Sequence, residues 1–527
     1  MEGWSSGVVE RWKKAFSTTP ALHRSSTPPS WRIFLSLAFV AALSYLPGIR
    51  HGFVYGDHGA IVENAFLAEP ANVLRVLKLE AFRDPQVVDG QRPVLLLTMF
   101  LDRAGSAAPQ PWRHHTTNLF LHAMAVLLLF QLVRRLGGGI RIGAGVAATA
   151  ALVLALHPAW SEAVQLPSYR EDLLGLVFVL AYLLADFIAR PVVRWPVQLL
   201  ALALALGSKE SAWAAPLLLG WMRICVPAQG RSLRALLAAV GVGLALVLAT
   251  VLVGYAGRPM QAMGGSWNGI SLRWPENLWT APWIFWRYVA LVAVPFPLVA
   301  DRMVEAVPVA WSIRFLGSLA ALLLLGWCAW RLRRTQPMLG LGAGWIVIAF
   351  GPISNLVPLF NPMAERYLYG LAPGFALLVA VTVVKMRRSW LLPVLCVGWI
   401  AVLQLRIGDW RDDATLWAVT AWQEPGSARA QVWLGLQAKQ QGDRAAARVA
   451  FERARAANPQ EVSALINLGV LCGEEGDLAE AERFFREAVR IRPEKREAQS
   501  NLALALELQG KTEDGKRKTE ETENGRK

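Results

Sequence analysis

Apolar segments long enough to cross a lipid bilayer recur through the first 405 residues of this 527-residue chain. A membrane-crossing helix needs about 20 mostly apolar residues, whereas a strand of a membrane barrel needs only about 10. Backbone groups inside hydrocarbon must be paired, and a helix pairs them within one segment. We therefore predict an all-α fold, a polytopic transmembrane helix bundle with about eleven spans. The spans are expected at residues 33–49, 116–133, 142–160, 172–189, 195–207, 211–225, 234–254, 311–330, 337–357, 367–384 and 389–405.

Lysine and arginine are concentrated in short segments between these spans, and the whole chain has a net charge of +15. Six segments together hold 19 Lys or Arg residues against two acids. They are residues 1–32, 134–141, 190–194, 223–234, 331–334 and 385–388. Cytoplasmic loops of membrane proteins are enriched in Lys and Arg in this way. The pattern predicts a multi-pass integral membrane protein with a cytoplasmic N-terminus and an extracytoplasmic C-terminus, and it predicts no nucleic-acid partner.

One further apolar segment, residues 279–300, is not counted among the spans. Arg287 lies near its middle, and a single crossing there would move the basic residues 331–334 to the outer side. A charge at membrane depth costs roughly 2.5–3.5 kcal/mol. We therefore expect this segment to lie at the interface or to re-enter the membrane without crossing it.

The composition changes after Trp410, where two segments of 34 residues, 428–461 and 462–495, repeat one another. The matching pairs are Gly435 and Gly469, Gly442 and Gly476, Asp443 and Asp477, Phe451 and Phe485, and Pro459 and Pro493. This period and pattern predict tetratricopeptide repeats, each a pair of antiparallel helices. The repeats either stabilise the chain as a cap or offer a concave surface to a peptide or protein.

These patterns divide the chain into four parts. The parts are a cytoplasmic tail at 1–32, a transmembrane domain at 33–405 with its first outer loop at 50–115, repeats at 428–510, and a tail at 511–527. The last tail is strongly polar and is expected to be disordered, since it offers little apolar surface to bury.

Charged residues on the predicted outer side are the candidates for chemistry, because the sequence shows no metal-ligand spacing, phosphate-binding loop or nucleophile elbow. They are Asp57, Arg92, His115, His122, His157, Glu162, Arg170, Lys209, Glu210, Glu365 and Arg366. Ionisable groups near membrane depth mark ligand sites or pair with one another. In the second case, neighbours such as Lys209 with Glu210 and Glu365 with Arg366 would brace the spans.

Seven sequence motifs occur in the order of one known family. They are FVYGDHGAIVENAFL (53–67), QRPVLLLTMFLD (91–102), HHTTNLFLH (114–122), LHPAWSEAVQLPSYREDLL (156–174), SKESAWAAPLLL (208–219), GPISNLVP (351–358) and AERYLYG (364–370). In these motifs the chain resembles the transmembrane-and-tetratricopeptide (TMTC-like) O-mannosyltransferases and their bacterial relatives, over about residues 30–510. The resemblance implies a membrane glycosyltransferase with a GT-C-like transmembrane domain. The family usually has two adjacent acids in the first outer loop, whereas here Gly56 replaces the first and Asp57 remains.

The resemblance also implies roles for individual residues. The donor would be a sugar on a polyprenyl phosphate, with no certain cofactor, and Asp57 would stand beside the reacting carbon. Because an acceptor hydroxyl is only weakly acidic, a positioned carboxylate can serve as its base, a contribution of about 10²–10⁴-fold. The candidates to neutralise the donor phosphate are Arg92, Arg170, Lys209 and Arg366. The supporting residues are His115, His122, Glu162, Glu210 and Glu365.

Among the supporting residues, Glu210 and Glu365 would orient the cations. His115 and His122 are seven residues apart on one face of a helix and would hydrogen-bond the sugar. For His122 the alternative is packing inside the bundle.

The sequence therefore predicts an enzyme that moves a mannose-like sugar from a polyprenyl phosphate to an acceptor outside the cytoplasm. The acceptor is expected to be a protein or peptide held by the repeats. Two alternatives stay open: a non-catalytic scaffold, and a transporter of lipid-linked sugars that uses the same outer cavity. Gly56 favours the scaffold, whereas retention of Asp57 together with four cations favours the enzyme.

Overall fold

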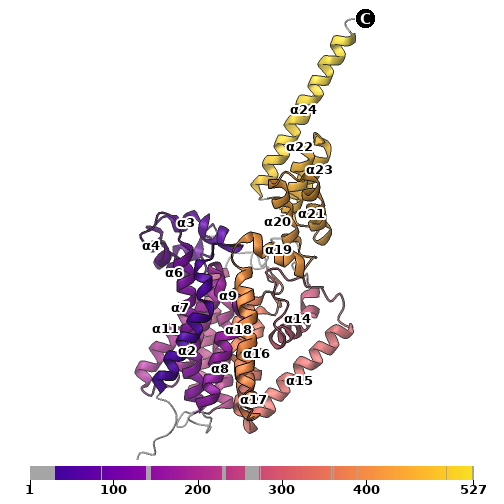
Figure 1. Ribbon diagram of the computed structural model, residues 1–527. Coiled ribbons are helices and arrows are strands. Elements are labelled where there is room, and N and C mark those ends of the chain that lie inside the picture. The colour runs from indigo at the N-terminus through magenta and orange to yellow at the C-terminus, as the bar shows by residue number, and fades with distance from the viewer. Residues whose placement is uncertain are drawn as a thin grey trace, which may run out of the picture.

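The computed structural model of the protein describes residues 30–84, 86–137, 144–227, 233–255, 272, 274–357, 359, 361–388, 390–493 and 495–524. Residues 1–29 of the expected N-terminal tail lie outside this set. Within it every regular element is a helix, which confirms the all-α prediction. Figure 1 shows a helical bundle with the C-terminal repeats stacked beyond one end, and helix α24 pointing away from it.

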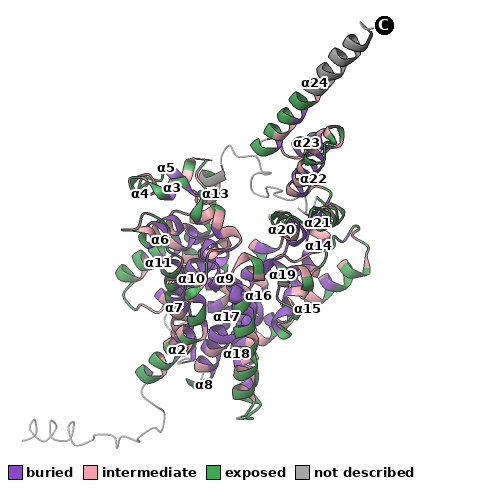
Figure 2. Cartoon of the chain, turned by 45° about the horizontal axis from the view of Figure 1, so that its top comes forward, coloured by how far each residue is buried: buried purple, intermediate pink, exposed green. Residues whose placement is uncertain are grey.

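Longer helices make up the membrane part of the described chain. They are α2 (Ser30–Tyr45), α7 (Pro111–Gly137), α8 (Ala144–Leu156), α10 (Arg170–Ala185), α11 (Pro191–Leu206), α12 (Ala215–Cys225), α13 (Leu233–Tyr255), α14 (Glu276–Ala293), α15 (Ile313–Thr335), α16 (Pro337–Phe350), α17 (Leu368–Lys385) and α18 (Leu391–Asp409). Each predicted span coincides with most of one of these helices, and α14 occupies the segment predicted to be interfacial or re-entrant. Helices α7, α8, α10 and α17 pack together, and most of their residues are buried (Figure 2).

Fewer helices than predicted are long enough to cross a membrane by themselves. Within the described ranges, six are both long and apolar enough, at Trp31–Arg50, Pro111–Gly137, Leu233–Leu252, Ile313–Thr335, Glu365–Lys385 and Leu391–Asp409. The pair Ala144–Leu156 and Pro158–Gln165, bent by 53°, would make a seventh. Helices α11 and α16 have only 16 and 14 residues. At about 1.5 Å per residue they reach about 24 Å or less, short of a hydrocarbon core of about 30 Å, so the predicted count of eleven is not confirmed.

Short helices and turns join the longer ones. In and next to residues 50–115, the predicted first outer loop, they are η1 (Leu46–Arg50), η2 (His58–Val62), α3 (Ala65–Ala68), α4 (Asn72–Leu77), α5 (Glu80–Arg83) and α6 (Pro93–Arg103). Further along they are η3 (Pro158–Trp160), α9 (Ser161–Gln165), η4 (Pro167–Tyr169), η5 (Glu210–Ala214), η7 (Gly351–Ile353) and η8 (Glu365–Tyr367). Proline stands near the start of η3, η4 and η7, where its missing N–H costs no helical hydrogen bond. Most of the charged residues that the motifs contain lie in these short elements or directly next to them.

The C-terminal part is a stack of helical hairpins. Its helices are α19 (Asp413–Gln423), α20 (Ala428–Gln440), α21 (Arg444–Ala457), α22 (Val462–Glu474), α23 (Leu478–Ile491) and α24 (Arg496–Asn524). The repeated glycines explain the pairing, because a Cβ at Gly435 or Gly469 would lie 2.5 or 2.6 Å from the ring of Phe451 or Phe485. The 34-residue period is therefore a repeated packing contact. Helix α24 extends as far as Asn524, so it includes most of the tail at 511–527 that is expected to be disordered.

Candidate active site

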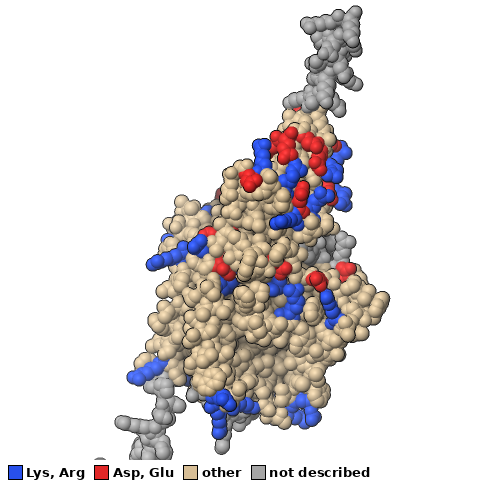
Figure 3. Space-filling model, turned by 45° about the vertical axis from the view of Figure 1, so that its right-hand side comes forward, with Lys and Arg blue, Asp and Glu red and all other residues tan. Residues whose placement is uncertain are grey.

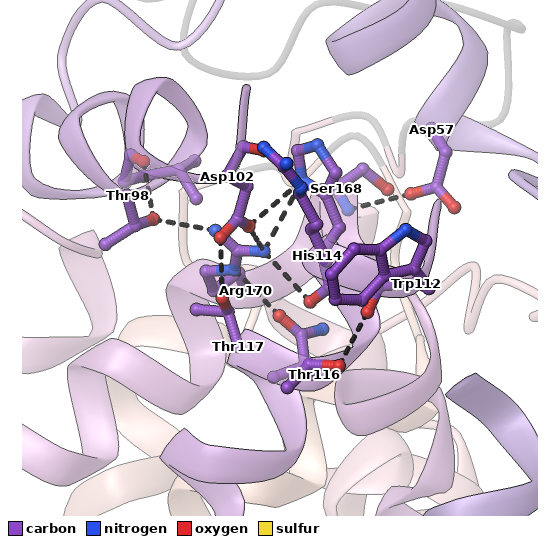
Figure 4. Close-up of polar contacts among 12 residues, drawn as sticks. Asp57, Thr98, Asp102, Trp112, His114, Thr116, Thr117, Ser168 and Arg170 are labelled. Atoms are coloured by element: carbon purple, nitrogen blue, oxygen red, sulfur yellow. Dashed lines mark hydrogen bonds and ion pairs between the residues drawn. The ribbon is translucent and has the colours of Figure 1, made fainter. Parts of the chain in front are cut away.

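Asp57 lies in the turn of residues 54–58, the Asp57 turn, which follows the first span along the chain, and its side chain is fully buried. One carboxylate oxygen accepts the backbone N–H of Ser168 at 2.8 Å, as Figure 4 shows, and the other accepts that of Val54 at 3.2 Å. Burial disfavours the charged form and raises the pKa of Asp57 to about 6, although both hydrogen bonds act to lower it. The turn therefore holds a carboxylate that is ionised at neutral pH and more basic than a solvated one.

Gly56 stands where the resembling family has its first acid. A Cβ atom at Gly56 would lie 3.1 Å from Oγ of Ser168 and 3.2 Å from the hydroxyl of Tyr169. Both distances are shorter than ordinary van der Waals contacts, so a side chain here would have to push a neighbour aside. The loss of the first acid thus coincides with the close approach of Tyr169, a residue to which the sequence analysis gave no role.

Tyr169 begins a row of rings and cations. The guanidinium of Arg366 lies 3.8 Å from the centroid of the Tyr169 ring and 4.8 Å from that of Tyr367. The ammonium nitrogen of Lys209 lies 5.3 Å from the Tyr367 centroid. Cations are attracted to aromatic faces at such distances. Two of the four predicted phosphate-binding cations are therefore connected through Tyr169 to the Asp57 turn.

Arg366 and Lys209 each pair with an acid from another helix. Nη1 of Arg366 donates to one oxygen of Glu162 at 2.7 Å, and the Arg366 backbone N–H donates to the other at 2.9 Å. Lys209 forms an ion pair with Asp172. All four side chains are buried, so the pairing offsets a desolvation cost that unpaired charges could not bear.

The pairs expected between sequence neighbours, Lys209 with Glu210 and Glu365 with Arg366, are wrong. Glu210 instead binds Arg92, with its Oε2 3.0 Å from Nη2. The backbone at Lys209 is extended, and Glu365 and Arg366 share the turn η8. Adjacent side chains in such segments point in different directions, so each finds a partner elsewhere in the fold.

Arg92 is the most accessible of the four cations, with 24% of its side chain exposed. It binds Asp89 at 2.9 Å, Glu171 at 3.3 Å and Glu210 at 3.0 Å. Burial would lower the pKa of Arg92, but these three carboxylates hold it well above its usual value. A donor phosphate would therefore have to displace a carboxylate to bind here.

Arg170, the first residue of α10, is fully buried. Its guanidinium donates to Asp102, to Oδ1 of Asn118 at 2.7 Å, to the hydroxyl of Thr98 at 3.0 Å and to the carbonyl of His114 at 3.0 Å (Figure 4). These bonds use most of its five N–H donors and tie α6, α7 and α10 together. The geometry gives Arg170 a bracing role and does not support its predicted role on the phosphate.

Glu365 is also a brace. One of its oxygens accepts the backbone N–H of Val299 at 2.5 Å and lies 3.0 Å from Arg302, and the other lies 3.2 Å from Arg406. These contacts connect η8 to α18 and to the segment after α14. The predicted role of orienting Arg366 has no support in this arrangement.

His115 and His122 lie on the buried side of α7, as their spacing predicts. Nδ1 of His122 is 2.9 Å from the hydroxyl of Tyr369, and its ring centroid is 4.9 Å from that of Tyr45. His122 therefore packs inside the bundle, which is the alternative to a sugar contact. Within the described chain, Nε2 of His115 is buried without a hydrogen-bond partner, and the residue is only 5% exposed.

A narrow pocket lies between α10, η5, α12, α16 and α17. Asp172 and Tyr367 line it together with apolar residues such as Leu218 and Trp345. Its free volume is about 30 Å³, room for about two water molecules. The pocket adjoins the row of rings and cations, because Tyr367 and Asp172, the partner of Lys209, form part of its wall.

Among the residues that the structure describes, no group of three or more His, Cys, Asp or Glu residues is placed to hold a metal ion.

Comparison with known proteins finds one matching family model and several similar proteins. The family model described as tetratricopeptide repeat matches residues 434–495. Protein O-mannosyl-transferase Tmtc1 of Drosophila melanogaster is 33% identical over 201 residues, which are 36% of this chain and 22% of the relative. Tmtc2 of the same organism is 32% identical over 167 residues, 31% of this chain and 17% of the relative. Protein O-mannosyl-transferase F38B6.6 of Caenorhabditis elegans is 23% identical over 410 residues, 73% of this chain and 56% of the relative.

The chain is thus similar to three proteins named protein O-mannosyl-transferases. This finding confirms the resemblance that the seven motifs indicate. The chain spans about a fifth of the length of the first two relatives and about half of the third.

The site contains residues to which the sequence analysis gave no role. Inside the motifs they are Asp102, Tyr169, Glu171, Asp172 and Tyr367. Glu171 and Asp172 begin an apolar helix, so the cost of burying charge could have identified them. The tyrosines carry no comparable signal. Asp413 and Arg429, which contact the Asp57 turn from the C-terminal part, lie outside every motif.

Proposed function

We propose that this chain is a membrane glycosyltransferase that moves a mannose-like sugar from a polyprenyl phosphate to a protein hydroxyl outside the cytoplasm. The observation that carries the proposal is the buried Asp57 turn, connected through Tyr169 to Arg366 and Lys209. The relatives named protein O-mannosyl-transferases support the reaction class and a protein acceptor.

In this reaction the acceptor oxygen bonds to the anomeric carbon while the bond from that carbon to the phosphate oxygen breaks. The hydroxyl proton passes to Asp57, and the polyprenyl phosphate leaves with the electron pair. A carboxylate offers about four lone-pair positions, and two backbone N–H groups occupy two of them. Because Asp57 has no exposed surface, acceptor binding must open a path to it. Catalytic contacts often become aligned only when substrate binds.

Lys209 is the best-placed cation for the donor phosphate. Its ammonium group carries three donors, and among the described residues its ion-pair partner is Asp172. Asp172 and Tyr367 also line the pocket, whose other walls are largely apolar. An isoprenoid chain in a widened form of this pocket would bring its phosphate to Lys209. Arg366 would add a second positive charge across the Tyr367 ring.

We also propose that the repeats and the Asp57 turn lie outside the cytoplasm. Figure 3 shows Lys and Arg side chains gathered at the end of the membrane part that lies away from the repeats. Such a cluster is typical of a cytoplasmic face. A reporter active only in the cytoplasm, fused after Gly510, should stay silent, whereas a strong signal would reverse the proposed orientation.

A non-catalytic scaffold is the second candidate function. Gly56 in place of the family's first acid favours it, as does the pairing of all four candidate cations with carboxylates. In that case the repeats would bind partners and the outer charges would serve to hold the spans together.

A transfer assay separates the two candidates. The full-length chain in nanodiscs is given polyprenyl-phosphate mannose and a serine- and threonine-rich acceptor protein. Asp57→Asn keeps the size of the side chain but cannot take the proton, so turnover should fall about 100-fold or more while donor binding changes little. Asp443→Asn, at an exposed helix cap in the repeats, is the matched control. Transfer at the parent rate by Asp57→Asn would exclude Asp57 as the base, and no transfer by the parent would favour the scaffold.

A further inference from the structure

Asp413, the first residue of α19, contacts the Asp57 turn twice. Its Oδ1 accepts the backbone N–H of Tyr55 at 2.9 Å. Its Oδ2 lies 2.6 Å from Nε2 of His58. The two bonded residues flank Asp57 on either side, so a single carboxylate from the C-terminal part holds both ends of the turn that carries the proposed base.

The turn needs such support because its backbone is strained. Tyr55 has a φ of +53°, a left-handed conformation that is unfavourable for a bulky residue. Strained residues persist where their surroundings hold them, and they are concentrated at functional sites. The Tyr55 ring meets the edge of Trp417, also on α19, with centroids 5.2 Å apart. Helix α19 therefore holds both the backbone and the side chain of Tyr55.

The first repeat helix, α20, contributes to the same contact. The guanidinium of Arg429 donates to the hydroxyl of Tyr55 and to Oδ1 of Asn361, the latter at 3.0 Å, and it pairs with Asp301 at 3.2 Å. Ser427, the N-cap of α20, also donates to Asp301 at 2.8 Å. The root of the repeat array is thus fastened to three separate outer segments of the membrane part.

We infer that Asp413 is a positioning residue for Asp57, and that residues 413–429, which lead into the repeats, belong to the catalytic unit. This inference rests on the proposed function of Asp57 as the base. Asp413 acts through the turn and does not itself need to touch the substrate. Catalytic geometry is sensitive to displacements of about 1 Å, which can cost about 100-fold in rate. Release of Tyr55 and His58 would let Asp57 leave its place between Val54 and Ser168.

Two adjacent aspartates provide a matched pair of variants. Asp413→Ala removes both contacts with the turn. Asp412→Ala removes the N-cap of α19, in which Asp412 accepts the N–H of Thr415 at 2.8 Å, but leaves those contacts in place. Asp413→Asn is the conservative variant, because its amide oxygen can still accept the N–H of Tyr55.

The first measurement is hydrogen exchange of the full-length chain in nanodiscs, on peptides that cover residues 53–62. Asp413→Ala should increase exchange in these peptides, and Asp412→Ala should leave it near the parent level. Unchanged exchange in Asp413→Ala would overturn the inference. This readout needs no transfer activity, so it still decides whether Asp413 holds the turn if the proposed function fails.

The second measurement is steady-state transfer from polyprenyl-phosphate mannose. Asp413→Ala should lower kcat about tenfold or more with the donor KM little changed, since the base is displaced while the cation row stays intact. Asp413→Asn should recover most of this loss, and Asp412→Ala should stay within about threefold of the parent. A parent-like kcat for Asp413→Ala despite faster exchange would remove Asp413 from catalysis. Equal losses of kcat in Asp412→Ala and Asp413→Ala would show that Asp413 only stabilises α19.

Discussion

The membrane part and the repeats use the same charged residue types in opposite ways. In the membrane part, Arg366 pairs with Glu162, and their side chains are 5% and 0% exposed. The neighbouring pair of Arg406 and Glu365 is equally buried. In the repeats, Arg444 pairs with Glu474 at 59% and 35% exposure. Figure 3 shows the consequence, since acids and bases mingle over the surface of the repeats.

The difference in burial determines how much each ion pair matters for stability. Removing one partner of a buried pair leaves an uncompensated charge and costs about 3–5 kcal/mol, whereas an exposed pair is worth about 0–1 kcal/mol. The exposed pairs of the repeats are therefore replaceable. The buried pairs of the membrane part are retained at a cost that only a bracing or binding role explains.

Arg366→Ala should have the largest effect on stability. It leaves Glu162 buried without its partner, and the free energy of unfolding should fall by about 3–5 kcal/mol. The measurement is thermal or denaturant unfolding in detergent. The matched control is Arg314→Ala, whose pair with Glu305 is 53% and 81% exposed. Equal losses in the two variants would break the comparison between buried and exposed pairs.

Gly469→Ala should come next, and it should act on the repeats alone. Its Cβ would lie 2.6 Å from the Phe485 ring, an overlap that costs about 1–3 kcal/mol. The unfolding transition of the repeats should move to lower temperature while that of the membrane part stays. Gly510→Ala, at a position with open space around it, is the control. A shift of both transitions would show that the two parts unfold together.

The pH dependence of transfer sharpens the same comparison, because Asp57 is the buried acid of the membrane part that we propose as the catalytic base. With a pKa of about 6, Asp57 loses its base form as the pH falls, so transfer at pH 5 should be about tenfold below the plateau above pH 7. Between about pH 4 and 6 the folded state holds a proton that the unfolded chain has released. The contribution of Asp57 to stability therefore decreases as the pH rises through this range. A flat rate profile from pH 5 to 8 would exclude a base of this kind.

Lys439→Ala should have the smallest effect. The Lys439–Glu474 pair has side chains 29% and 35% exposed, with a separation of 2.8 Å. Its loss should change the free energy of unfolding of the repeats by no more than about 1 kcal/mol. Urea unfolding at low and high salt provides the measurement. A loss comparable to that of Arg366→Ala would show that the repeats also depend on their charges.

Local pattern was sufficient for the elements of both parts. Apolar runs place a helix at each of the predicted spans, and the 34-residue period places the hairpins with their glycine–phenylalanine contacts. The pattern was insufficient for the number of membrane crossings, because helices such as α11 and α16 are apolar but short. Their ends depend on where neighbouring turns are packed, and a hydropathy pattern does not contain that information.

The candidate site divides in the same way. The sequence by itself determined that charged residues collect near the ends of the predicted spans, and their motifs indicated the resemblance that the comparisons support. Only the tertiary structure decided their partners, so that Arg366 meets Glu162 and Lys209 meets Asp172 while their chain neighbours turn elsewhere. The hydrogen bond between Tyr55 and Asp413 joins two residues that are 358 positions apart in the sequence. Hydrogen bonds and ion pairs act over a few ångströms, so the partner of a charge is set by the fold that brings distant segments together.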